Sequence, residues 1–188
     1  MVIRVAGNLG ERLQGRILGK KHFAVLCSSL ADTPAGEFVL LDFQGVQLVT
    51  GSWVNAAILP LYSWAAAPQI DLFPVLCNLK KDWLDEFRLV AEASGRCFLV
   101  AENDREPLEA ILVVGELEPL QQEAMKVVQE LGTATGAGLK RSNPEDSRGA
   151  TAWNNRLKDL YRKRLLRRVK SGREQKYYPI AGEVVYDG

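Results

Sequence analysis

The sequence contains few residues of the kinds that carry enzyme chemistry. It has one histidine, His22, and three cysteines, Cys27, Cys77 and Cys97, whose odd number and spacing fit neither a metal site nor a disulfide framework. A P-loop, an HExxH motif, a CxxC pair and a glycine-rich nucleotide-binding fingerprint are all absent. We therefore expect no catalytic residues, no metal and no cofactor, and we expect the cysteines to be reduced core residues.

The chain also lacks the sequence features of membrane and secreted proteins. Its most apolar run, residues 46–73, is interrupted by two prolines and by Asn55 and Asp71, so no stretch of about 18 residues is apolar enough to span a bilayer. The first residues lack the basic start and apolar core of a signal peptide. These absences predict a cytoplasmic protein without a membrane partner.

Charge is unevenly distributed although the totals nearly cancel, with 24 basic and 23 acidic residues. Residues 139–188 contain 13 Lys and Arg against six Asp and Glu, a net charge of +7. Residues 1–138 contain 11 basic and 17 acidic residues, a net charge of −6. This asymmetry predicts one part that binds a polyanion and another with a different task, although a solvated helix face would also produce it.

The pattern of apolar residues changes near residue 117, and 188 residues suffice for two small domains. We therefore predict domains at residues 1–116 and 117–188. In the first, buried-strand patterns such as EFVLLDFQGV and LFPVLCNL alternate with helical patterns in the order β-α-β-α-β-α-β-β. This order predicts the α/β class, with helices packed against a sheet.

Residues 39–58, VLLDFQGVQLVTGSWVNAAI, form a buried strand, an Asp-containing turn and a loop with a serine just before a helix. This arrangement resembles the sulfate-transporter and anti-sigma-antagonist (STAS) fold and its STAS-like relatives, loosely over residues 2–116. The family's loop reads Asp-Ser-Ser-Gly and its second serine is phosphorylated. Ser52 falls at that place, within Thr50-Gly51-Ser52-Trp53, so the resemblance implies a possible phosphosite at Ser52. Alternatively, Ser52 is a plain amino-terminal cap of the helix.

The second domain begins with a helical pattern in which Pro119 stands early and Gly132 just past the end, with Leu131 on the apolar face. A glycine-rich segment, TATGAGLKR, follows and predicts an irregular second helix. Thr151 is expected to cap the third helix.

The third helix is predicted to have one apolar and one polar face. Trp153, Leu157, Leu160 and Tyr161 recur at spacings of three and four and would face the core. Amide and guanidinium groups suit base edges, whereas ammonium groups suit phosphates. The residues left to point outward are Asn154, Asn155, Arg156, Lys158 and Arg162.

After this helix, LLRRVKS and EQKYYPI are predicted to be two short strands joined through Gly172. Alternation would place Leu166 and Tyr178 inward. The cations expected to meet a phosphate backbone or minor groove are Arg168, Lys170, Arg173 and Lys176.

The block from residue 155 to 180, with NRLKDLYRKRLLRR and SGREQKYYPI, resembles bacterial and archaeal winged helix-turn-helix regulators. The resemblance implies a C-terminal winged helix-turn-helix that binds duplex DNA.

The pattern concerns fold and says nothing about which DNA sequence is bound.

The leading functional hypothesis is a DNA-binding transcriptional regulator. In it, the STAS-like domain senses or recruits a partner and the winged helix binds duplex DNA, with two copies forming a homodimer on a two-fold site. The alternative is a partner-switching interaction module that is regulated by a kinase at Ser52 and whose basic domain docks on an acidic protein. Neither hypothesis assigns an enzymatic activity to the chain.

Overall fold

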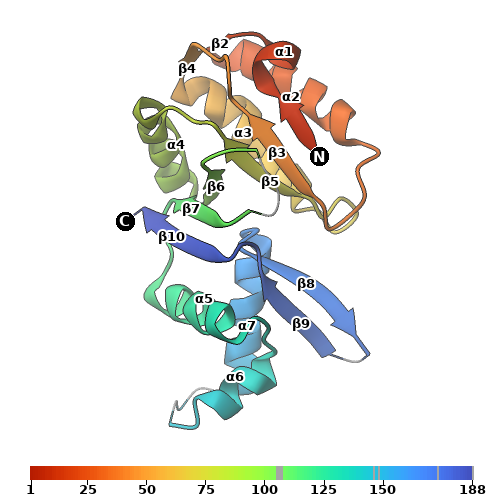
Figure 1. Cartoon of the computed structure of the whole chain (residues 1–188), viewed down its shortest axis with the longest axis vertical. Helices are drawn as coiled ribbons and strands as arrows, with labels where there is room; N and C mark the ends of the chain where they lie inside the picture. The colour runs from red at the N-terminus through yellow and green to blue at the C-terminus, as the bar shows by residue number, and fades with distance from the viewer. Residues whose placement is uncertain (105–107, 146, 148, 173, 188) are drawn as a thin grey trace. The chain divides into compact units, whose positions relative to one another are not determined.

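The chain forms two compact units in the computed structural model (Figure 1). The structure describes residues 1–104, 108–145, 147, 149–172 and 174–187. Unit 1 contains Met1–Glu116 and the segment from Val184 onward, and unit 2 contains Leu117–Glu183. The predicted second domain was residues 117–188, whereas the segment from Val184 onward belongs to unit 1.

Within the described residues, unit 1 is built on a six-stranded sheet in the order β1-β3-β5-β6-β7-β10. Its strands are β1 (Val2–Arg4), β3 (Phe38–Asp42), β5 (Phe73–Cys77), β6 (Phe98–Ala101), β7 (Ala110–Val114) and β10 (Glu183–Asp187). The first four run parallel, and β7 is antiparallel to β6. The predicted α/β class is confirmed, and the structure shows that the sheet is mostly parallel.

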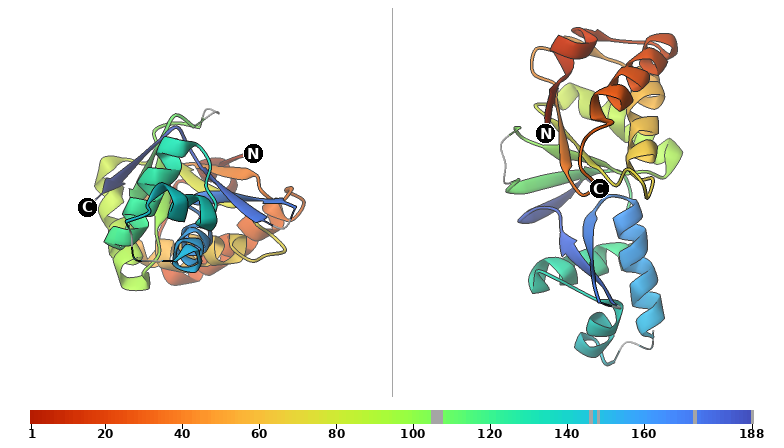
Figure 2. Two further views of the ribbon diagram at one scale, coloured as in Figure 1. Left: turned by 90° about the horizontal axis from the view of Figure 1, so that it is seen from below. Right: turned by 90° about the vertical axis from the view of Figure 1, so that its right-hand side faces the viewer.

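Three helices connect the parallel strands, and right-handed crossovers between sequential neighbours place such helices on one face of a sheet. They are α2 (Arg16–Leu30), α3 (Gly51–Ala65) and α4 (Lys81–Ser94), and Figure 2 shows α2 beside α3. Val39 and Leu41 of β3 share one buried core with Trp53 of α3 and Phe87 of α4. The shorter elements are α1 (Val5–Leu9), β2 (Arg12–Leu13) and β4 (Leu48–Val49).

The contact between α2 and α3 depends on a glycine and a histidine. A Cβ on Gly19 would lie 2.7 Å from the Ala56 Cβ, so only glycine permits this close crossing. Next to it, the Trp53 Nε1 donates a hydrogen bond of 3.1 Å to the Nδ1 of buried His22. Burial lowers the pKa of His22, which favours the neutral ring that this bond requires.

Unit 2 consists of three helices followed by a hairpin. The elements are α5 (Pro119–Leu131), α6 (Gly136–Ser142), α7 (Ala150–Arg162), β8 (Leu166–Ser171) and β9 (Glu174–Pro179). Helix α7 packs against α5, α6 and β8. Ala134, between α5 and α6, pairs with Tyr177 of β9 through two backbone hydrogen bonds of 2.9 Å. This short bridge ties the helices to the hairpin.

The start and end of α5 were predicted correctly from the sequence, whereas the prediction for α6 is wrong. Helix α5 begins at Pro119 and is followed by Gly132 in the left-handed conformation, as predicted. Leu131, expected in the core, is 51% exposed. The predicted irregularity of the second helix is wrong, because α6 is a regular helix from Gly136 to Ser142.

The chain leaves unit 1 after β7 and returns to it at β10. These two strands are neighbours in the sheet although unit 2 separates them in the sequence. Unit 2 is therefore an insertion between adjacent strands, connected to unit 1 at both of its ends.

Candidate nucleic-acid interface

Helices α6 and α7 cross at close range, and the start of α6 makes this possible. The Thr135 hydroxyl caps α6 by accepting a hydrogen bond of 3.0 Å from the Gly138 N–H. A Cβ on Gly136 would lie 2.7 Å from the Ala150 carbonyl oxygen and 2.9 Å from the Asn154 backbone nitrogen. The glycine-rich segment that seemed a weak helix former is thus the contact surface for α7.

The inward face of α7 agrees with the sequence prediction. Trp153, Leu157 and Leu160 are fully buried, and Tyr161 is 6% exposed. The predicted cap is wrong, however, because the helix begins at Ala150 and Gly149 precedes it, so Thr151 lies inside the first turn.

The opposite face of α7 is polar and carries two cations. Asn155, Lys158 and Arg162 are exposed and follow one another at spacings of three and four, so they form one stripe along the helix. Arg162 also forms an exposed ion pair of 3.2 Å with Asp159. Asn154, also exposed, lies at the side of this stripe, towards α6.

Arg156 does not join the stripe. Its guanidinium carbon lies 5.2 Å from the centre of the Trp153 ring, and the residue is partly buried. Arg156 was predicted to point outward, but it lies against the ring of a core tryptophan.

The hairpin divides its cations between two faces. Arg168 pairs directly with Tyr177, and Val169 pairs with Lys176. Because side chains alternate along a strand, Arg168 and Lys170 share the face of Tyr177, whereas Lys176 lies on the other face. Lys176 borders a separate cleft with Ala134 and Leu139. Arg173, also predicted to bind DNA, lies outside the described residues.

The buried tyrosine of the hairpin is Tyr177, which is 1% exposed, rather than the predicted Tyr178. The connection between Ser171 and Glu174 is two residues long and contains Gly172 at φ +63°. This turn fixes the register of β9, and the register determines which tyrosine faces inward.

Arg168 links the hairpin to α7. Its guanidinium carbon lies 4.1 Å from the centre of the Tyr161 ring, and its Nη2 donates a hydrogen bond of 3.4 Å to the Tyr161 hydroxyl. Burial raises the pKa of Tyr177, while the positive charges of Arg168 and Arg162 act to lower it. Both cations therefore lie near one hydroxyl, where α7 and the hairpin meet.

The α7 stripe and the β8 cations on the Tyr177 face lie on two elements that pack against each other, and together they form a polar and cationic area. We call it the basic surface, and it comprises Asn155, Lys158, Arg162, Arg168 and Lys170. Arg164 does not belong to it, because this residue is 1% exposed and its guanidinium carbon lies 4.9 Å from the centre of the Tyr161 ring.

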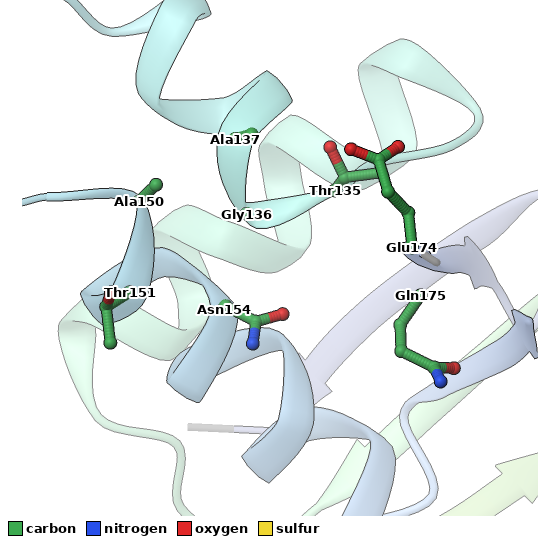
Figure 3. Close-up of a pocket in the computed structure, with 8 residues that line it drawn as sticks. All are labelled: Thr135, Gly136, Ala137, Ala150, Thr151, Asn154, Glu174 and Gln175. Atoms are coloured by element: carbon green, nitrogen blue, oxygen red, sulfur yellow. The ribbon is translucent and has the colours of Figure 1, made fainter. Parts of the chain in front are cut away.

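An open cleft of about 330 Å³ lies between the first turn of α7 and the hairpin (Figure 3). Its walls are the starts of α6, α7 and β9, and the polar residues that line it include Thr135, Thr151, Asn154, Glu174 and Gln175. We call it the Glu174 cleft. Glu174 is not among the DNA ligands predicted from the sequence, because charge and spacing single out only cations and amides.

In unit 1, Ser52 is exposed but does not cap α3. The helix begins at Gly51, and the Gly51 N–H donates a hydrogen bond of 2.5 Å to the Glu86 carboxylate of α4. The Ser52 hydroxyl oxygen lies 3.1 Å from that of Thr50. The amino terminus of α3 therefore already contacts an anionic group.

The carboxylate at the end of β3, that of Asp42, is buried and hydrogen-bonded to neighbouring groups of the protein. Asp42 is 3% exposed and accepts hydrogen bonds from the Gln44 N–H at 2.9 Å and the Asn78 Nδ2 at 2.7 Å. In the described part of the chain, no group of three or more His, Cys, Asp or Glu side chains could hold a metal ion. The three cysteines are free thiols.

Comparison with known proteins identifies no relative of this chain. No family model, no curated protein and no solved structure matches the chain. Among the described residues, no helix is both long enough and apolar enough to cross a membrane.

Proposed function

We propose that the chain is a DNA-binding transcriptional regulator in which unit 2 is a winged helix-turn-helix. In this proposal α7 is the recognition helix and the β8–β9 hairpin is the wing. The order of elements in unit 2, with a bridge at Ala134 before α6 and a hairpin after α7, supports this assignment. The observation that carries the proposal is the basic surface, because its cations follow the exposed side of α7 and continue onto β8.

The residues of the basic surface suit different parts of a duplex. The amide of Asn155 can donate to and accept from a base edge, and the exposed ammonium of Lys158 suits a phosphate. Lys170, near the end of β8, would contact the backbone beside the groove that α7 enters. Because one such module covers a short site, we expect two copies to bind a two-fold site.

For unit 1 we propose a STAS-like role in sensing or recruiting a regulatory partner. Phosphorylation of Ser52 is the less favourable mechanism, because a phosphate there would be close to the Glu86 carboxylate at the start of α3. Like charges at such a position repel each other.

The proposal is tested by measuring the binding of the full chain to a random-sequence duplex over a series of salt concentrations. We expect binding that weakens steeply with salt, and Lys158→Glu or Lys170→Glu should reduce both the affinity and the salt dependence. Each lost phosphate contact reduces the slope of log K against log salt by about 1. Lys158 and Lys170 are better positions for substitution than Arg162 and Arg168. Arg162 also forms an ion pair with Asp159, and Arg168 donates a hydrogen bond to Tyr161.

The matched control is Lys126→Glu, which makes the same charge change at an exposed position of α5. It should bind like the unaltered protein. Absence of duplex binding at low salt, or equal weakening by all three substitutions, would contradict the proposal.

A further inference from the structure

The Glu174 cleft brings a carboxylate into one cleft with Asn154 of α7, and this carboxylate lies on the hairpin face opposite to Arg168 and Lys170. Figure 3 shows Glu174 turned towards the start of α6, and Asn154 projecting from α7 into the space in front of β9. The cleft is therefore bordered by the recognition helix on one side and by the wing on the other.

A carboxylate at this place would repel the phosphates of a duplex, so it would weaken binding that depends on phosphate contacts alone. Among the described residues, neither a cation nor a hydrogen-bond donor contacts the Glu174 carboxylate. Its oxygens only accept hydrogen bonds, so they are free to receive a donor from a ligand. A donor that enters the cleft also meets the amide of Asn154, which can both donate and accept.

The edges of the bases in the major groove differ in the group that such a carboxylate would meet. Adenine and cytosine present an exocyclic amino group, whereas guanine and thymine present a carbonyl oxygen. A carboxylate accepts a hydrogen bond from the amino group and repels the carbonyl oxygen. A group that only accepts hydrogen bonds therefore distinguishes adenine and cytosine from guanine and thymine.

We propose that Glu174 is a specificity-determining residue that selects an amino-bearing base, adenine or cytosine, at one position of the DNA site. The proposal rests on the proposed function of unit 2. Glu174 acts from the wing, together with Asn154 of α7, and the cations of the basic surface supply the affinity that the carboxylate reduces. The preference is confined to the one base that borders the cleft.

The experiment selects bound sequences from a random duplex pool with the full chain and with Glu174→Gln, and then measures affinities for duplexes that differ at single positions. We expect the unaltered protein to prefer adenine or cytosine at one position by about five- to 150-fold. Glutamine can donate as well as accept, so Glu174→Gln should lose this preference and keep the others. Glu130→Gln, the same change at an exposed position of α5, should keep all of them.

Two results would overturn the proposal while leaving DNA binding intact. In one, Glu174→Gln selects the same sequences and binds every duplex more tightly by the same factor, which would mean that the carboxylate only repels phosphates. In the other, it behaves like the unaltered protein in both measurements. If the unaltered protein binds no duplex, the proposed function fails and this proposal fails with it.

Discussion

Replacing Gly136 by alanine tests the close crossing of α6 and α7. The added Cβ would lie 2.7 Å from the Ala150 carbonyl oxygen and 2.9 Å from the Asn154 backbone nitrogen, and neither backbone atom can rotate away. Overpacking of this kind costs about 1–3 kcal/mol. Alanine favours the helix over glycine by up to about 1 kcal/mol, which offsets part of this cost. We therefore expect the free energy of unfolding of unit 2 to fall by about 1–2 kcal/mol.

The assay uses the tryptophan that lies nearest to this contact along α7. Trp153 is the only tryptophan of residues 117–183, so its ¹⁹F resonance after 5-fluorotryptophan labelling reports the unfolding of unit 2 in urea. The control is Gly138→Ala in the same helix, where a Cβ would meet only the Thr135 hydroxyl, at 3.2 Å. If Gly136→Ala unfolds at the same urea concentration as the unaltered protein, or at a higher one, the close crossing is refuted.

Two further predictions concern unit 1. The folded state lowers the pKa of His22, so it binds fewer protons than the unfolded state and its stability should fall as pH falls below about 6.5. His22→Gln, which keeps an acceptor for Trp53, should show a smaller loss between pH 7.5 and pH 5.5 in thermal unfolding, and an equal loss would contradict the assignment. Glu86→Ala removes the acceptor at the Gly51 N–H and should destabilise α3 by about 0.5–2 kcal/mol, measured from the ¹⁹F resonance of Trp53 in urea. An unchanged midpoint would show that this contact contributes nothing.

The parts of the fold that depend on local pattern could be predicted from the sequence. Trp83 and Phe87 recur at a helical spacing and are buried on α4, and Gly95 ends that helix in the left-handed conformation. The inward face of α7 follows the same rule. In each case the residues that decide the structure lie within one or two turns of each other.

The cap of α3 could not be predicted, because the group that accepts a hydrogen bond from its first N–H is distant in the sequence. Ser52 seemed suited to cap α3, but Glu86, on the next helix, accepts the hydrogen bond from the Gly51 N–H. Gly136 lowers helix propensity locally, yet its lack of a side chain permits the contact with α7. A tertiary contact overrides the local preference at both positions.

The candidate interface was predicted in outline, and its details depend on register and stacking. Charge and spacing identified Lys158 and Lys170, which are exposed as expected. The same reasoning treated Arg168 as a simple phosphate ligand, whereas its guanidinium group stacks on Tyr161. Sequence spacing cannot show which arginine meets an aromatic ring across two elements.

The return of the chain at β10 has a consequence for the order in which the protein can fold. A ribosome delivers residues 1–116 before the strand that completes their sheet, so β7 remains an edge strand until β10 emerges. Exposed strand edges invite pairing with other chains. Nascent or truncated chains that end before Val184 should therefore aggregate more readily than the full chain.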